Sequence, residues 1–273
     1  MILIPVLCIQ YMIMGASLIL NGLGIHIFQV LKKGNKNQHL LLKNFAGTEV
    51  AKAVYDLIAL SLHYFYENAS KQLAPYLFVT EINFMTIVYF SFISVNMDRL
   101  LCIILKEKYT KYIKTSTAQK AICCMWIGSA LPGFFLLLIF GCKSKANAYY
   151  YIVWDTIVVV VIVVTYILVI NKLHGKTRSS SGESKRKAAK KKRSLNLAIL
   201  LTTAFMVCNV IPNIVILFLS NGTTYYAMAV LWSTGYLVDP LLYIFAAKRS
   251  RKTAKSIFKK LLRQIPRHII NDV

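Results

Sequence analysis

Acidic residues inside long apolar segments are the first candidates for chemistry in this sequence. The chain has only ten Asp and Glu residues, and six of them lie within or at the edge of such segments: Glu49, Asp56, Glu81, Asp98, Asp155 and Asp239. An ionisable side chain inside a membrane costs about 2.5–3.5 kcal/mol on insertion scales, so it normally faces the interior of a helix bundle and marks a functional site. The sequence leaves a structural alternative open for each acid, in which a paired or protonated carboxyl group holds two helices together.

Helical spacing places several of these side chains on common faces. Glu81 and Arg99 are eighteen residues apart, which is five turns of α-helix, so they share a face and are separated by roughly 27 Å of helix. That face has a candidate ligand-binding acid toward one end and a candidate effector-binding cation at the other. Glu49, Lys52 and Asp56 follow a three-then-four spacing and also share a face. Lys52 is interpreted mainly as the cation that neutralises these two neighbours, because unpaired charges in lipid are costly.

The segments that carry these residues are predicted to be membrane-spanning helices. Of the 273 residues, 57% are hydrophobic, a balance typical of membrane proteins rather than soluble domains. A transmembrane helix needs about 20 mostly apolar residues, so seven helices with short connections nearly fill this length. The apolar runs lie at about 3–31, 40–65, 75–105, 118–141, 149–173, 194–220 and 224–247. The predicted fold is all-α: a single domain, 1–273, with a seven-transmembrane helix bundle, then a short amphipathic cytoplasmic eighth helix and tail over 248–273.

The distribution of positive charge predicts the orientation of the bundle. The connections expected outside hold only three basic residues: Lys71, Lys143 and Lys145. The other connections and the tail hold nearly all the rest, and cytoplasmic loops are the ones enriched in Lys and Arg, so the N-terminus is expected outside and the C-terminus inside. Two N-x-[ST] glycosylation patterns, at Asn68 and Asn221, fall in connections on the expected outer side. No cleavable signal peptide is expected, because the first apolar run is long and no basic segment precedes it.

A strongly basic segment lies between the fifth and sixth apolar runs. Residues 185–193, KRKAAKKKR, have the composition of a nucleic-acid patch, but a position between two membrane spans excludes that function, so no nucleic-acid partner is expected. Each Lys or Arg beside the anionic inner leaflet gains about 1 kcal/mol, so anionic lipids are expected partners. Four neighbouring serines are candidate phosphorylation sites that would cancel part of this charge: Ser179, Ser180, Ser181 and Ser184. A solvated loop that only obeys the charge rule is an equally open alternative.

Motifs at the ends of two spans resemble those of the rhodopsin-like (class A) G-protein-coupled receptors. Asp-Arg-Leu at 98–100 resembles the family's Asp-Arg-Tyr, and Asp-Pro-x-x-Tyr at 239–243 resembles its Asn-Pro-x-x-Tyr. NFAGTE at 44–49 is similar to the second-span pattern, with Glu49 at the position of the family's sodium-site Asp. Single-residue matches occur in other spans: Asn21, Trp126, Tyr166, Phe205 and Cys208. Residues 248–262 resemble the family's amphipathic eighth helix on the inner leaflet.

This resemblance implies a plasma-membrane receptor that converts an extracellular signal into activation of a heterotrimeric G protein. The residues implied to contact the G protein or support that contact are Asp98, Arg99, Tyr166 and Tyr243. Glu49 and Asp239 are implied to line a mid-bundle pocket for Na⁺. Glu81 stands where amine receptors carry the Asp that pairs with the ligand's ammonium, so Glu81 and Asp155 are candidate contacts for a cationic ligand, a small amine or a basic peptide. A Glu81 satisfied by neighbouring Tyr or Asn side chains is the alternative.

The chain departs from the family pattern at several positions. Asn209 replaces the sixth-span Trp, and Pro212 falls one residue late. Ala74 replaces the third-span Cys, which leaves Cys142 without its family partner and Cys8 as the other cysteine near the outer face. The missing third-span Cys, a missing fifth-span Pro and the Asp-Pro pair are shared with melanocortin-type receptors, to which the chain bears a weak similarity.

Other functional classes fit the sequence less well. There is no Gly-rich phosphate loop, nucleophile motif or metal-ligand spacing, and the five His residues are scattered, so no enzymatic activity is expected. A small transporter or channel would use intramembrane acids, but the seven non-repeated spans lack the paired, interrupted helices of inverted repeats. A receptor relative that does not signal stays an open alternative, because Leu100, Ala74 and Asn209 are losses from the family pattern.

Overall fold

The chain is all-helical in the computed structural model, which describes residues 3–31, 35–105, 108–141, 144–174, 199–218, 222–245 and 248–264. No strand occurs among these residues, which confirms the predicted all-α class. The long helices are α1 (Leu3–Val30), α2 (Lys36–Phe65), α3 (Glu67–Leu105), α7 (Ser144–His174), α10 (Gly222–Phe245) and α11 (Lys248–Gln264). The shorter ones are α4 (Tyr109–Tyr112), α5 (Thr115–Ser129), α6 (Pro132–Phe140), the helical residues 199–205, the π-helix η2 (Met206–Val210) and α9 (Ile211–Phe218).

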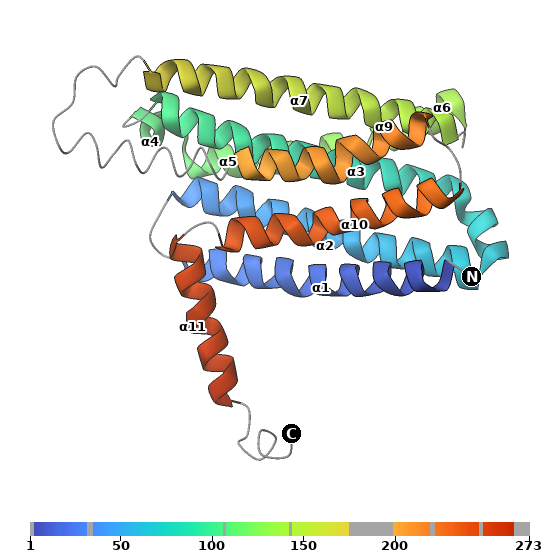
Figure 1. Cartoon of the computed structure of the whole chain (residues 1–273). Helices are drawn as coiled ribbons and strands as arrows, with labels where there is room; N and C mark the ends of the chain where they lie inside the picture. Colours follow the sequence, from blue (N-terminus) through green and yellow to red (C-terminus); the bar gives the residue numbers. More distant parts are fainter. Residues whose placement is uncertain are drawn as a thin grey trace.

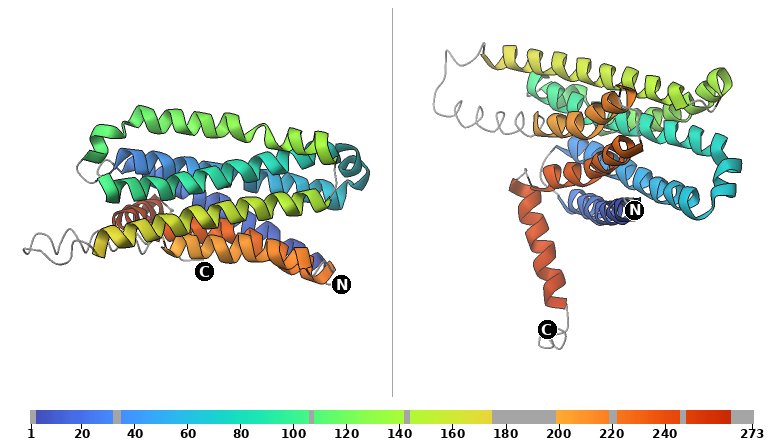
Figure 2. Two further views of the ribbon diagram at one scale, coloured as in Figure 1. Left: turned by 90° about the horizontal axis from the view of Figure 1, so that it is seen from above. Right: turned by 45° about the vertical axis from the view of Figure 1, so that its right-hand side comes forward.

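The helices lie side by side as a bundle around α3 (Figure 1). α3 packs against α2, α5, α6 and α7, while α1 packs between α2 and α10. α9 and η2 contact both α7 and α10, which closes the arrangement into a ring. α11 leaves the bundle at a steep angle, at the end opposite the N-terminus (Figures 1 and 2).

Five helical stretches among the described residues are long and apolar enough to cross a membrane. They are Pro5–Val30, Asn68–Cys102, Thr115–Phe140, Ile199–Ile216 and Ala227–Phe245. α2 has the length but contains Glu49, Lys52 and Asp56 within three turns, so it is less apolar. α7 contributes a shorter apolar stretch, Tyr149–Thr165.

The surface of the bundle is largely apolar, and its interior contains polar and charged side chains among the apolar ones. Large apolar side chains point outward: Ile19 is 74% exposed, Leu138 is 81% exposed and Phe218 is 75% exposed. Polar and charged side chains are buried as well, among them Ser17, Asn21, Glu49, Lys52 and Asp155. Apolar groups outside and polar groups inside suit a hydrocarbon surrounding, because lipid solvates the first and cannot hydrogen-bond the second. The chain therefore has the construction of a membrane protein.

Two predicted connections are shorter than expected. The prediction of a connection over 66–74 was wrong, because α3 begins at Glu67 and only Tyr66 separates it from α2. The Tyr66 N–H donates to the Leu62 carbonyl, and the Tyr66 carbonyl accepts from Ser70, so both helices use this one residue as a cap. The segment before Pro75 is rich in good helix formers, which favours helix over loop. The connection at 142–148 is similarly shortened, because α7 begins at Ser144.

The fourth predicted span, 118–141, is broken between α5 and α6 rather than continuous as predicted. α5 ends at Ser129 and α6 begins at Pro132, a residue that cannot donate a backbone hydrogen bond. Asn83 of α3 binds both sides of the break: its Nδ2 donates to the Ala130 carbonyl at 3.1 Å, and its Oδ1 accepts from the Gly133 N–H at 2.9 Å. A Cβ on Gly133 would clash with the backbone carbonyl oxygen of Val79, so glycine allows α6 to approach α3 closely.

Candidate functional site

A buried ion-pair cluster joins α2 and α3 in the half of the bundle away from α11. It consists of Lys52, Asp56 and Glu81 and is called here the Lys52 cluster. The Nζ of Lys52 lies 3.1 Å from Oε1 and 3.2 Å from Oε2 of Glu81, and it also pairs with Asp56 one turn along α2. The side chain of Lys52 is 3% exposed, that of Asp56 16% and that of Glu81 29%. Lys52 is thus the innermost group and Glu81 the most accessible one.

Phenol groups from three helices complete this cluster. Tyr236 of α10 donates from its hydroxyl to Oδ2 of Asp56 at 2.9 Å, and Tyr151 of α7 donates to Oε1 of Glu81 at 3.3 Å. The ring of Tyr55 lies 5.3 Å from the Lys52 Nζ, and its hydroxyl donates to the Leu77 carbonyl of α3. Four helices, α2, α3, α7 and α10, therefore converge on two carboxylates and one ammonium.

The sequence correctly predicted that Lys52 neutralises a neighbouring acid, but it identified only one of the two acids that Lys52 contacts. Lys52 neutralises Asp56, as predicted, but its second contact is Glu81 rather than Glu49. This contact joins residues 29 positions apart, and helix periodicity gives no information about pairs on different helices. It also means that Glu81 is satisfied by Lys52 and Tyr151, close to the alternative that the sequence left open.

Glu49 and Asp239 are buried deeper in the bundle, on α2 and α10. They are 2% and 4% exposed. Oε2 of Glu49 and Oδ1 of Asp239 have no hydrogen-bond partner. Buried carboxylate oxygens without donors favour a compensating cation or proton, and Na⁺ takes oxygen ligands, so these residues fit the implied sodium pocket.

Among the described residues, Asp155 makes no hydrogen bond or ion pair with a member of the Lys52 cluster. Its carboxylate is 3% exposed and accepts from the hydroxyl of Tyr89 at 2.9 Å and from Nδ2 of Asn213 at 2.6 Å. It therefore links α3, α7 and α9. The Tyr89 ring stacks on Trp154 and meets Phe205 edge-on, so this link sits on an aromatic core.

The sixth span contains a wide turn at the position of its sequence irregularity. η2 covers Met206–Val210, between Phe205 and Pro212. A π-helical turn is wider than an α-helical turn, because its hydrogen bonds run from i to i+5 and enclose one more residue. η2 thus accommodates one additional residue without a break in the helix. Pro212 follows inside the same continuous helix, where its missing N–H leaves one backbone carbonyl of the preceding turn without a helical donor.

Pro240 creates a free backbone carbonyl that α1 uses. Proline has no N–H, so the carbonyl of Tyr236, four residues earlier, lacks its helical donor. Ser17 Oγ donates to this carbonyl at 3.0 Å and Asn21 Nδ2 donates to it at 3.2 Å. The hydroxyl of Tyr243 donates to Oδ1 of Asn21. The proline-containing span is thereby fastened to α1 by side chains in place of one helical hydrogen bond.

Tyr243 is held against α1 and α2 by packing as well. Its side chain is 1% exposed, and its ring contacts those of Phe28 and Phe45 with centroid distances of 5.6 Å and 6.4 Å. Gly24 provides the space, because a Cβ there would lie 2.8 Å from Cε2 of Tyr243. Of the other tyrosine predicted for this region, Tyr166, the structure gives only its position in α7.

The Asp-Arg pair lies at the end of α3 nearest α11. Asp98 and Arg99 are 6% and 4% exposed. The hydroxyl of Tyr109, in α4, donates to Oδ1 of Asp98 and accepts from Nδ2 of Asn37. Burial and the bond to Asp98 raise the pKa of Tyr109, so this phenol stays protonated and remains a donor at any physiological pH. Sequence inspection missed Tyr109, although an aromatic hydroxyl eleven residues after the acid was the available signal.

Some of the remaining predicted positions lie in helices of the described structure, and others fall outside the described residues. Asn68 is exposed in the first turn of α3. Trp126 donates its indole N–H to Asn44 of α2 at 3.0 Å. Cys8 is a free cysteine. Other predictions fall outside the described residues: the glycosylation site Asn221, the phosphorylation sites Ser179, Ser180, Ser181 and Ser184, and Cys142.

Comparison with known proteins assigns no family to this geometry. No protein-family model matches the chain, and no curated protein matches it at a significant level.

Proposed function

We propose that the chain is a divergent receptor of the rhodopsin-like type, which activates a heterotrimeric G protein in response to an extracellular cationic ligand. The observation that carries this proposal is the buried Asp98–Arg99 pair at the end of α3, with Asp98 bound by the Tyr109 hydroxyl. Ionisable side chains inside a membrane-spanning bundle are rare and normally mark a functional site, so a buried arginine at this helix end supports an effector-binding role. Arg99 is the residue that would contact the G protein, with Tyr166 and Tyr243 supporting it.

A bundle of seven spans in the plasma membrane is part of this proposal. Five stretches qualify by length and composition. α2 and α7, with 30 and 31 residues, are long enough to be the other two. Successive long helices alternate in direction, and the N-terminus lies at the opposite end from α11 (Figure 1), as an odd number of crossings requires.

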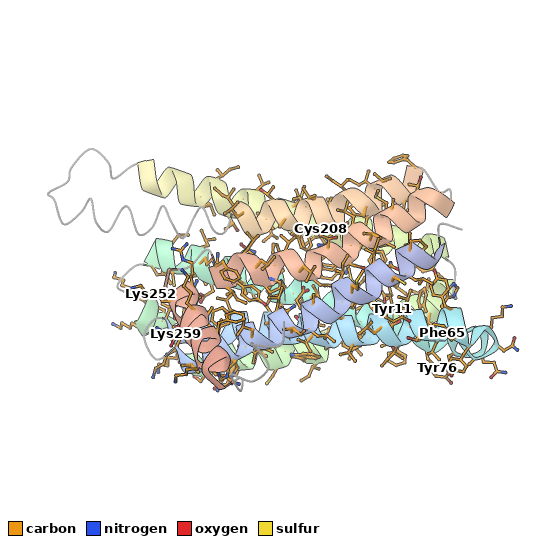
Figure 3. All side chains as sticks on the ribbon, turned by 60° about the horizontal axis from the view of Figure 1, so that its bottom comes forward. Tyr11, Phe65, Tyr76, Cys208, Lys252 and Lys259 are labelled. Atoms are coloured by element: carbon orange, nitrogen blue, oxygen red, sulfur yellow. The ribbon has the colours of Figure 1, made fainter. Side chains whose placement is uncertain are left out.

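The ends of the molecule differ in a way that supports the proposed orientation. Lys252 and Lys259 lie at the α11 end, whereas Phe65 and Tyr76 lie at the other (Figure 3). α11 contains eight Lys and Arg residues and no acid, so it would lie on the anionic inner leaflet. The α11 end is then cytoplasmic, and the Lys52 cluster lies in the outer half of the bundle.

The proposal is tested by nucleotide exchange on purified G proteins. Membranes containing the chain are compared with membranes containing Arg99→Ala, across the main G-protein classes. We expect basal exchange with at least one G protein and its loss in Arg99→Ala. Arg251→Ala, which removes an exposed arginine from α11, is the matched control and should retain exchange.

Two results would count against the proposal. Exchange that survives Arg99→Ala would remove the observation on which it depends. Silence on every G protein, together with an ion flux that Glu49→Gln abolishes, would instead favour a transporter or channel that uses the buried acids.

A further inference from the structure

The Lys52 cluster contains more negative than positive charge. Two carboxylates, Asp56 and Glu81, surround one ammonium, that of Lys52. The two phenols that donate to these carboxylates are neutral, so the cluster has a formal charge of −1 when both acids are ionised. In a low-dielectric interior such an excess favours uptake of one more positive charge.

The two ion pairs of Lys52 differ in what they connect. The pair with Asp56 lies within α2, one turn apart. The pair with Glu81 joins α2 to α3 and involves the most exposed member of the cluster, 29% against 3% for Lys52. A cation arriving from outside would therefore meet Glu81 first, while Lys52 would keep Asp56 as its partner.

Building on the proposed function, we propose that Lys52 is an internal competitor for the ligand site and that the ligand is a compound with a single ammonium group. In the free protein Lys52 neutralises Glu81. The ligand's ammonium takes its place on Glu81, and Lys52 turns wholly to Asp56. Two positive charges then balance two negative ones, and the ion pair between α2 and α3 is replaced by one within α2.

This exchange of partners gives the ligand a way to change the packing of the bundle. α2 and α3 lose their charged connection, while Tyr236 still joins α10 to Asp56 and Tyr151 still joins α7 to Glu81. The Lys52–Glu81 pair thus restrains the free state, and its loss favours the active one.

Substitutions within the cluster separate this mechanism from simple loss of stability. Glu81→Gln leaves one ammonium and one carboxylate and imitates the charge balance of the liganded state, so basal exchange should rise about fivefold or more, the usual range of coupling between sites. Asp56→Asn leaves Lys52 with Glu81 alone and should lower basal exchange. Tyr149→Phe, which removes an exposed hydroxyl from α7 outside the cluster, is the matched control and should change little. Thermal unfolding in detergent establishes that each variant is folded.

The ligand class is tested with methylammonium, the smallest alkylammonium ion. Methylammonium chloride should raise exchange by the unaltered chain but not by Glu81→Gln, and potassium chloride at the same ionic strength should have no such effect. Equal effects of the two salts on the unaltered chain would overturn the ligand class.

The outcomes distinguish this inference from the proposed function. If exchange depends on Arg99 but Glu81→Gln and Asp56→Asn move it in the same direction or not at all, the inference fails and the receptor function stands. If neither the unaltered chain nor Glu81→Gln promotes exchange on any G protein, the proposed function fails and takes the inference with it. Exchange seen only in Glu81→Gln supports both.

Discussion

The contact between Gly24 and Tyr243 predicts a large difference between two glycine substitutions on α1. In Gly24→Ala the new Cβ would lie 2.8 Å from Cε2 and 3.2 Å from the hydroxyl oxygen of Tyr243. The ring cannot easily move aside, because it is 1% exposed and packs against Phe28 and Phe45. Gly22, two residues earlier, has nothing within 4 Å of the corresponding Cβ position.

The size of the effect follows from three contributions. Both substitutions gain up to about 1 kcal/mol from replacing glycine with alanine inside a helix. Only Gly24→Ala introduces overpacking, which costs about 1–3 kcal/mol. It also displaces the Tyr243 hydroxyl from Asn21, and a buried group left without its partner costs about 1–3 kcal/mol. Gly24→Ala should therefore be less stable than Gly22→Ala by about 2 kcal/mol or more.

Thermal unfolding in detergent measures this difference directly. Gly22→Ala should match or exceed the unaltered chain, and Gly24→Ala should unfold several degrees lower. Combining Gly24→Ala with Tyr243→Leu, which removes the ring atoms concerned, should recover most of the specific loss because the two positions are in contact. Equal melting temperatures for the two alanine variants, or simple additivity in the double variant, would refute the argument that Gly24 exists to accommodate Tyr243.

Three further predictions concern buried polar contacts. Tyr89→Phe removes one of the two donors to Asp155 and should destabilise the protein by about 1–3 kcal/mol in thermal unfolding, whereas Tyr150→Phe, whose hydroxyl is only partly buried, should cost less. Asn83→Ala frees both backbone groups that it binds at the break of the fourth span, so hydrogen–deuterium exchange there should become faster while other spans keep their protection. Tyr109→Phe removes the donor to the acid of the Asp-Arg pair and should raise basal nucleotide exchange several-fold; an unchanged rate would show that this hydroxyl does not restrain the pair.

The sequence predicted those features that depend on composition and on spacing within one helix. Apolar runs fixed the all-helical class, and the three-then-four spacing correctly put Lys52 beside Asp56. The basic amphipathic segment after residue 247 is the helix α11. The first turns of α3, Glu67–Ala74, were not predicted as helix because their polar residues were interpreted as a loop, although their helix propensity is good.

Contacts between helices were beyond the sequence for a physical reason. Which faces meet depends on crossing angles and on small residues that allow close approach, and neither follows from periodicity. Lys52 with Glu81, Tyr89 with Asp155, and the side chains of α1 on the Tyr236 carbonyl are all of this kind. In each case the sequence showed the polar residues but not which of them are in contact.

The wide turn η2 has a consequence for how this span is compared with any other. One additional residue in an α-helix would rotate everything beyond it by about 100°, so that inward-facing positions would become lipid-facing. The π-helix confines the additional residue to Met206–Val210. Both halves of the span therefore keep their inward-facing positions toward the bundle, but the residue numbers of these positions are shifted by one between the two halves. A position-by-position alignment without a gap is therefore correct on one side of Met206 and one residue wrong on the other. The residues of this span beyond Val210 that face the bundle must be identified from their contacts, such as that of Asn213 with Asp155, and not by counting from residue 199.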